Sequence, residues 1–135
     1  MKGALYEKSI LLSIEVVKYY QWLTNTKREY VMSKQILRSG TSVGANVHEA
    51  DCAASDADFV SKMRIALKEA SETEYWLTVL ERTGYYDSAF DIIKGLLDEC
   101  KRMVVSSIKT VNGRISQEEL RKKEEAKKRS YKAKE

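Results

Sequence analysis

Residues 35–49 of this chain read QILRSGTSVGANVHE, and their apolar and small residues recur at steps of three and four positions. Side chains at such steps share one face of an α-helix. That face consists of Ile36, Gly40, Val43, Gly44 and Val47. A glycine costs a helix interior about 1 kcal/mol relative to alanine, so two of them on one face indicate a close approach to a neighbouring helix. The stretch predicts a tightly packed helix.

A second, polar stripe follows the same predicted helix. It consists of Arg38, Ser42, Asn46 and Glu49. Two interpretations are open: Arg38 and Glu49 serve a ligand, or they satisfy each other and neighbouring groups at a junction between helices or subunits. Buried charges require pairing and hydrogen bonds, which Ser42 and Asn46 are placed to supply. We expect this stripe to be a structural or interaction motif that fixes packing register.

Composition sets the outer limits of the fold. The 135 residues are 43% hydrophobic and contain six glycines and no proline, as expected for one helical domain with one core. Met1–Leu5 lacks the apolar core of a signal peptide, and no run approaches the roughly 18 apolar residues of a membrane span, so we expect a cytoplasmic protein. Cys52 and Cys100 are expected to be free thiols, buried or half-buried.

The first predicted helix covers about residues 5–23 and has a wide apolar arc. One row of the arc consists of Tyr6, Ile10, Ile14 and Val17, and the other of Leu5, Leu12, Val16, Tyr19 and Leu23. A surface helix of a monomer needs a narrower stripe. We therefore expect this helix to be covered by its own bundle and by a neighbouring subunit.

Capping signals delimit the other helices. Thr26 and Glu29 have the spacing of a capping box that opens a second helix, which runs to about residue 50. Ser55 is expected to cap a third helix. The third seam is Phe59, Met63, Ala66, Ala70, Thr73, Leu77 and Leu80, whose steps of four and three are typical of helices crossing at about 20°.

A fourth helix completes the pattern. Gly84 is expected to end the third helix in a left-handed conformation, and Asp87 or Ser88 to cap a fourth that ends near Gly113. Short turns imply antiparallel neighbours. The sequence predicts an all-α fold, an antiparallel up-down-up-down four-helix bundle over residues 1–114, followed by a charged tail, helical or disordered, over residues 115–135.

Positive charge is concentrated in the tail. Residues 115–135 hold eight Lys and Arg against five Asp and Glu, which accounts for most of the net charge of +4. The tail is either a solvated arm or a basic arm that attracts phosphates. Its candidate contacts are Arg121, Lys122, Lys123, Lys127, Lys128 and Arg129. On the third helix, Arg64 and Lys68 lie one turn apart and form a second candidate phosphate contact, which nearby glutamates would partly neutralise.

The residues do not suggest catalysis. The single histidine, His48, excludes the paired Glu-x-x-His motif of di-iron bundles, and a helix would fan out the metal-capable side chains of residues 48–52. No glycine-rich phosphate loop follows a strand. Tyr75 and Trp76 form either a stacking surface or a core or interface anchor. We expect a protein that is not an enzyme and has no metal or cofactor.

Two motifs together carry a family resemblance. Residues 38–49 (RSGTSVGANVHE) and 58–77 (DFVSKMRIALKEASETEYWL) resemble small bacterial proteins encoded in intervening sequences of 23S rRNA genes, which are related to the accessory protein of diversity-generating retroelements. The resemblance covers about residues 5–112. It implies a four-helix bundle that assembles into a ring-like homopentamer and, from the retroelement relative, binding of nucleic acid and a reverse transcriptase. The chain departs at Ala50, where many relatives have glycine, and in the near-neutral charge of its predicted bundle.

Two functions remain as hypotheses. The first is a non-enzymatic, oligomeric accessory factor that associates with structured RNA or DNA. The second is a protein–protein interaction scaffold that binds no nucleic acid and presents helical grooves to a partner, such as a reverse transcriptase or another protein. Neither involves a membrane. Deleting residues 115–135 separates the two if the tail carries the binding.

Overall fold

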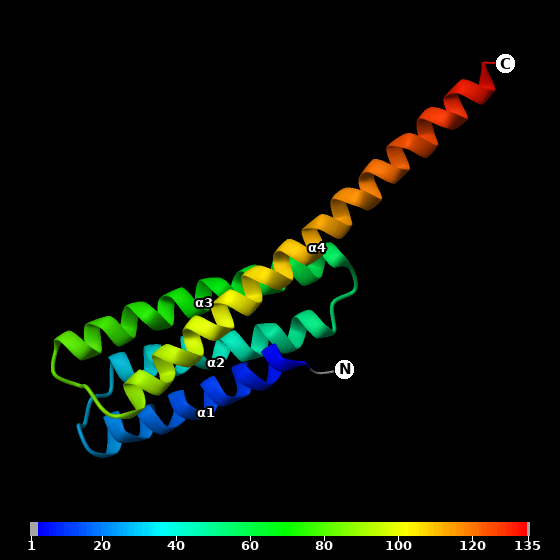
Figure 1. Ribbon diagram of the computed structural model, residues 1–135. Coiled ribbons are helices and arrows are strands. Elements are labelled where there is room, and N and C mark those ends of the chain that lie inside the picture. Colours follow the sequence, from blue (N-terminus) through cyan, green and yellow to red (C-terminus); the bar gives the residue numbers. More distant parts are fainter. Residues whose placement is uncertain (1–2, 135) are drawn as a thin grey trace.

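The structure of the chain, a computed structural model, describes residues 3–134. The described part contains four helices and no strand: α1 (Ala4–Asn25), α2 (Met32–Asp51), α3 (Asp56–Arg82) and α4 (Ala89–Ala133). Consecutive helices run in opposite directions (Figure 1). α1 and α3 each pack against both α2 and α4, so the four helices surround one core. The predicted all-α antiparallel four-helix bundle is confirmed.

The core is built from one apolar face of each helix. Its fully buried large side chains include Leu12, Val16, Tyr19, Leu23, Ile36, Val43, Leu80, Ile93 and Leu97. The α3 seam is buried from Met63 to Leu80, whereas Phe59 is half-buried because it lies at the open end of the bundle, near the start of the helix. Periodicity was sufficient to predict the buried positions of α1, α2 and α3 because each of these helices buries one continuous face.

Two glycines of α2 allow α1 to approach closely. A Cβ atom added at Gly40 would lie 2.8 Å from both Cγ atoms of Val16, and one added at Gly44 would lie 3.2 Å from the carbonyl oxygen of Ser9. Gly44 also faces the hydroxyl of Ser13 at 3.3 Å. The predicted close approach is therefore confirmed, and its partner is α1.

The start of α2 differs from the predicted capping box. Thr26 is the C-cap of α1 and does not open the next helix. Instead, the Glu29 carboxylate accepts hydrogen bonds from the N–H groups of Val31, Met32 and Ser33, at 3.1, 3.0 and 2.6 Å. These are N–H groups that a helix start leaves without partners, and a negative charge there is favourable. The Glu29 side chain thus caps α2 from outside the helix.

The remaining caps follow the local sequence signals. Ser55 Oγ accepts the N–H of Asp58 at 3.1 Å and caps α3. Gly84 follows α3 with φ of 91°, the left-handed conformation expected of it. Before α4, it is Asp87, not Ser88, that supplies a side-chain acceptor, to the N–H of Ala89 at 3.3 Å.

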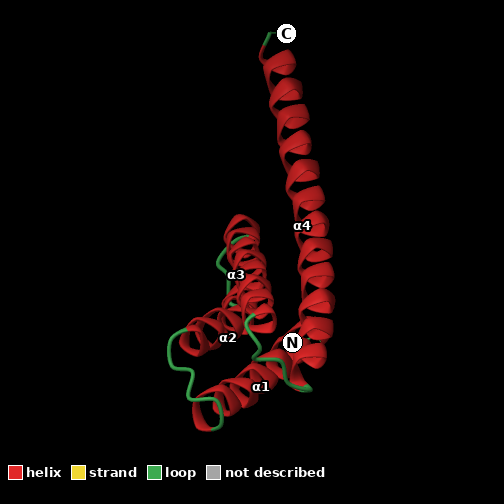
Figure 2. Cartoon of the chain, turned by 90° about the vertical axis from the view of Figure 1, so that its left-hand side faces the viewer, coloured by secondary structure: helices red, strands yellow, loops and turns green. Residues whose placement is uncertain are grey.

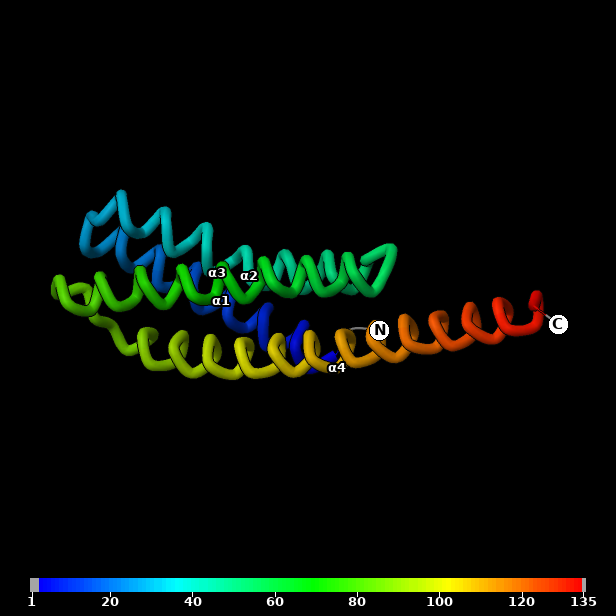
Figure 3. The backbone as a smooth tube through the Cα atoms, turned by 90° about the horizontal axis from the view of Figure 1, so that it is seen from above, coloured from blue at the N-terminus to red at the C-terminus, as the bar shows by residue number. Residues whose placement is uncertain are grey.

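The prediction that the fourth helix ends near Gly113 is wrong, because α4 continues without a break to Ala133. Its last third projects far beyond the other helices (Figures 2 and 3). Gly113 does not have positive φ, and the sequence after it is rich in Glu, Lys, Arg and Ala, which favour helix. Ile115 is the last described residue of α4 that packs against the core. We call residues 116–133 the arm.

The α1–α2 contact makes a stability prediction. In Gly40→Ala, the added Cβ meets Val16, and we expect the overpacking to lower the free energy of unfolding by about 1–3 kcal/mol. Gly95→Ala is the matched control: nothing lies within 4 Å of its added Cβ, so helix propensity should raise stability by up to about 1 kcal/mol. Urea unfolding measures both. A Gly40→Ala protein as stable as the wild type would contradict this close contact.

Glu29 makes a pH-dependent prediction. Burial alone would raise its pKa, but the N–H groups of Met32, Ser33 and Val31 outweigh burial and hold the pKa below its ordinary value. Its stabilising effect is therefore present above the unfolded pKa, about 4.3, and is lost as pH falls through the lower folded value. Glu29→Ala should cost about 0.5–2 kcal/mol at pH 7.

The gap between wild type and Glu29→Ala should narrow as pH falls below about 4. The control is Glu119→Ala on the arm, whose carboxylate is exposed and should leave stability within about 0.5 kcal/mol of wild type. Urea unfolding from pH 3 to 7 checks the prediction. A gap independent of pH would show that the Glu29 charge does not cap α2.

Candidate nucleic-acid interface

The polar stripe of α2 lies against α3. Arg38 Nη2 donates to both carboxylate oxygens of Glu72, at 2.8 and 3.0 Å, and Arg38 Nη1 lies 4.0 Å from Glu69 Oε2. Glu49 pairs with Lys62 of α3, Oε2 to Nζ 3.2 Å. Arg38 and Glu49 lie about 16 Å apart along the helix and do not pair with each other. Both side chains are more than half exposed, at 56%, so the stripe is a seam between helices and not a buried network.

The smaller members of the stripe serve their own helix. Ser42 Oγ donates to the carbonyl of Arg38 at 2.6 Å, and Asn46 Nδ2 donates to the carbonyl of Ser42 at 2.8 Å. A polar α2–α3 contact that was not predicted lies deeper, where the buried hydroxyls of Ser39 and Thr73 are 2.9 Å apart. The sequence indicated only that both residues lie on the core-facing sides of their helices, and it gave no sign that their hydroxyls meet.

The acidic side of this seam holds a shielded carboxylate. Burial raises the pKa of Glu69, hydrogen bonding to Glu72 and its charge raise it further, and the Arg38 guanidinium opposes them. Glu69 Oε2 and Trp76 Nε1 are buried without a hydrogen-bond partner among the described residues. Two carboxylates, Glu69 and Glu72, thus share the guanidinium of Arg38.

The aromatic and sulfur side chains divide between core and surface. Trp76 packs against the core, whereas Tyr75 is 61% exposed and meets the Trp76 ring edge-on at 5.1 Å between ring centres. Cys100 is buried, and burial raises the pKa of its thiol to about 11. Cys52 is exposed, contrary to the expectation of burial, because it follows the last turn of α2. Both thiols are free.

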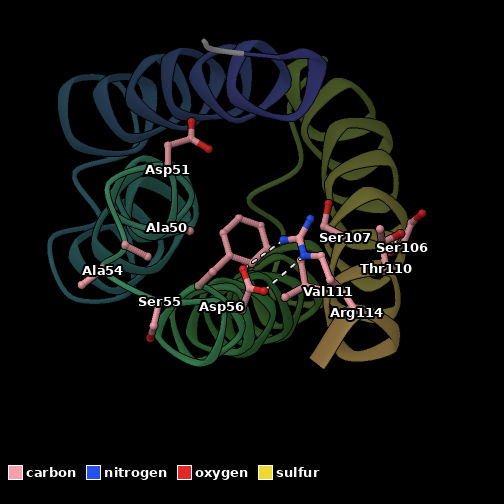
Figure 4. A pocket seen from close by; sticks show the side chains of 12 residues that line it. Ala50, Asp51, Ala54, Ser55, Asp56, Ser106, Ser107, Thr110, Val111 and Arg114 are labelled. Atoms are coloured by element: carbon pink, nitrogen blue, oxygen red, sulfur yellow. Dashed lines mark hydrogen bonds and ion pairs between the residues drawn. The ribbon is translucent and has the colours of Figure 1, made fainter. Parts of the chain in front are cut away.

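The bundle has an open end where α4 leaves it. A cavity of about 610 Å³ lies between the α2–α3 loop and α4 (Figure 4). Arg114 spans it with two hydrogen bonds to Asp56, Nε to Oδ2 3.1 Å and Nη2 to Oδ1 3.0 Å. The hydroxyls of Ser107 and Thr110 donate to carbonyls of their own helix. The Arg114–Asp56 pair joins α4 to the start of α3, just before the arm begins.

The structure does not bring the predicted bundle cations, Arg64 and Lys68, together with the arm. Arg64 and Lys68 are exposed on α3 and form no ion pair with a described residue. Arg64 lies about 12 Å along α3 from Asp56, while the arm points away from the bundle there (Figure 1). These two cations therefore form a site separate from the arm.

The arm carries the predicted tail cations on an exposed helix. Arg121 is engaged by Glu118 at 2.7 Å and Glu125 at 2.8 Å, and Arg129 lies 3.9 Å from Glu125. The other four predicted cations form no ion pair with residues 3–134: Lys122, Lys123, Lys127 and Lys128. Lysines on an exposed helix that have no ion-pair partner are available to an anionic ligand.

Sequence reasoning missed two cations that continue this surface onto the bundle. Arg102 and Lys109 are exposed on α4 and precede Lys123 by 21 and 14 residues. Side chains seven residues apart drift by about 20° around a helix, so the three lie within about 60° of one another on a slowly turning stripe. The spacing was visible in the sequence, but the near-neutral total charge of residues 1–114 concealed it.

α1 presents an apolar stripe to solvent. The exposed fractions of Ile10, Ile14 and Val17 are 37%, 44% and 37%, while the other row of α1 is buried in the core. No helix in the described part of the chain is both long and apolar enough to cross a membrane. Within residues 3–134, no three His, Cys, Asp or Glu side chains converge as a metal site requires.

Comparison with known proteins gives a family and a solved relative. The sequence model of the 23S rRNA-intervening sequence proteins matches residues 2–106. A crystal structure of a protein of unknown function from the S23 ribosomal protein family of Bacteroides thetaiotaomicron is 48% identical, with a TM-score of 0.76. The similarity covers 78% of this chain and 99% of that one. No curated protein matches the chain.

Proposed function

Because this chain belongs to the family of 23S rRNA-intervening sequence proteins, we propose that it is a non-enzymatic, self-associating accessory protein of the bacterial cytoplasm that binds structured RNA or DNA. The observation that carries the proposal is the arm, an exposed helix that projects from the bundle and carries five lysines without an ion pair to a described residue: Lys122, Lys123, Lys127, Lys128 and Lys132. The resemblance to the retroelement accessory protein supports the same class of ligand. Arg64 and Lys68 provide a secondary contact.

Electrostatics determines the character of this binding. Each lysine that neutralises a phosphate releases condensed counterions, so affinity falls steeply with salt and depends little on sequence. Several arms on one oligomer raise the overall affinity, because the second contact occurs at high effective concentration. Paired cations contribute less. Arg38, Lys62, Lys101 and Arg114 are all held by carboxylates.

Self-association rests on the exposed stripe of α1. Single exposed apolar residues are ordinary, but a row of them on one helix face is typical of an interface. We propose that Ile10, Ile14 and Val17 are covered by a neighbouring copy, and that the assembly is the homopentamer implied by the family resemblance. Assembly through the α1 face would place several arms on one oligomer.

The second candidate function is a protein-interaction scaffold. The α1 stripe favours it, since the same apolar row accommodates a helix of a different protein, such as a reverse transcriptase. In that case the charged arm keeps the protein soluble and the assembly binds no nucleic acid. Removing the arm cations distinguishes the two functions. It weakens nucleic-acid binding under the first and leaves binding of a protein partner unchanged under the second.

The arm lysines make the first functional prediction. A variant with Lys122, Lys123, Lys127 and Lys128 changed to Gln should bind a structured RNA hairpin and a DNA duplex at least about tenfold more weakly at 150 mM salt, because the arm loses four positive charges. The control changes two exposed lysines outside the arm, Lys34 and Lys94, and should bind nearly as wild type. Fluorescence anisotropy measures both. Unchanged affinity in the arm variant would favour the scaffold.

The α1 stripe makes the second functional prediction. Ile14→Lys places a charge in the proposed interface and should shift the oligomer towards monomer in sedimentation velocity, with thermal stability of the bundle nearly unchanged because the site is 44% exposed. Ile92→Lys is the matched control, since Ile92 is 52% exposed on α4. A wild-type protein that is monomeric at micromolar concentration would refute self-association.

A further inference from the structure

We propose that the arm lies in the major groove of a B-form DNA duplex, with one row of cations on the phosphates of each strand. This inference rests on the proposed function and names its ligand. The arm is an unbroken exposed helix of about 27 Å. A helix with side chains is about 10–12 Å across, which matches the roughly 12 Å major groove of B-DNA.

The arm cations are sorted around the helix. At about 100° per residue, Lys123 and Lys127 lie on one edge, and Lys128 and Lys132 lie on another, about 140° away. All four side chains are exposed and form no ion pair with a described residue. Two cationic edges on one helix can contact two phosphate rows at once, whereas a single strand offers one.

Two acids of the arm lie on the side away from the strip between the edges. Glu118 and Glu119 lie there with Lys122 and Arg129. Glu125 lies about 20° from Lys132 at the second edge, where Arg121 pairs with it at 2.8 Å and with Glu118 at 2.7 Å. Repulsion between Glu118 or Glu119 and the phosphates is therefore reduced in a groove-bound helix, and Arg121 offsets the charge of Glu125.

The strip between the two edges would face the bases. It consists of Gln117, Leu120, Glu124 and Tyr131. Gln117 and Glu124 have side chains that can reach hydrogen-bonding groups on base edges, and Leu120 can contact a thymine methyl. Glu124 is the one acid on this strip, and cytosine N4 is the donor that suits it. The strip has four side chains to contact the bases, so most of the affinity comes from the phosphate contacts.

Other partners fit the arm less well. A coiled-coil partner needs apolar residues every 3.5 positions, and a membrane surface needs an apolar face. The exposed large apolar residues within the described arm are Leu120 and Tyr131, eleven positions apart. The major groove of A-form RNA is deep and narrow and does not admit side chains in this way. B-form DNA is the ligand that matches both edges.

The test compares three ligands with the full-length protein by fluorescence anisotropy over a salt series: a 20-base-pair DNA duplex, an RNA duplex of the same sequence, and the single DNA strand. We expect the DNA duplex to bind most tightly. Lys127→Gln with Lys128→Gln removes one cation from each edge and should lower the salt slope by about 2. Lys122→Gln with Arg129→Gln removes the same charge from the back face, and the groove placement predicts a smaller loss of affinity than in the Lys127 and Lys128 variant.

A third variant separates shape from charge. Ala126→Pro breaks the arm helix without altering its charge, and we expect it to abolish the preference for duplex DNA, with circular dichroism verifying that the bundle stays folded. Equal or tighter binding of the RNA duplex, equal losses in the front and back pairs, or full DNA affinity in Ala126→Pro would each overturn the groove placement while the proposed function stands. Failure of the full-length protein to bind any of the three would overturn both.

Discussion

The close contact between α1 and α2 determines how the rest of the bundle is oriented. Gly40 and Gly44 let α2 pack onto Val16 and the backbone at Ser9. This contact fixes the rotation of α1, so the row through Leu12 and Val16 enters the core while the row through Ile10 and Ile14 faces solvent. The rotation of α1 therefore leaves this apolar row on the surface of the bundle, where we propose that a neighbouring copy covers it.

The same orientation distributes charge over the molecule. α2 turns its polar stripe towards α3, where Arg38 meets Glu72 and Glu49 meets Lys62. Arg114 and Asp56 join α4 to α3 at the end of the bundle. Beyond that point α4 has no neighbouring helix (Figure 2), so its lysines stay unpaired. Ion pairs within the bundle engage Arg38, Lys62 and Arg114, whereas the lysines of the arm face solvent.

Local signals in the sequence predicted much of the fold. The α3 seam from Met63 to Leu80, the Ser55 cap and the left-handed Gly84 depend on neighbours within one or two turns, and the structure confirms all three. The errors arose where the partner is remote or the signal is weak. Arg38 pairs with Glu72 on another helix, 34 residues away. Spacing along the sequence could not predict this pair. Gly113 resembles a helix end, but strong helix formers follow it and no proline stops the chain.

The most direct test of the central claim is the affinity of the full-length protein for structured RNA and duplex DNA over a salt series, with oligomeric mass recorded in the same buffers. Our account predicts an oligomer whose affinity falls steeply with salt, with a log–log slope of about −3.6 for each engaged arm of four free lysines. A well-formed oligomer that binds neither ligand at low salt would contradict the account and leave a protein-interaction scaffold.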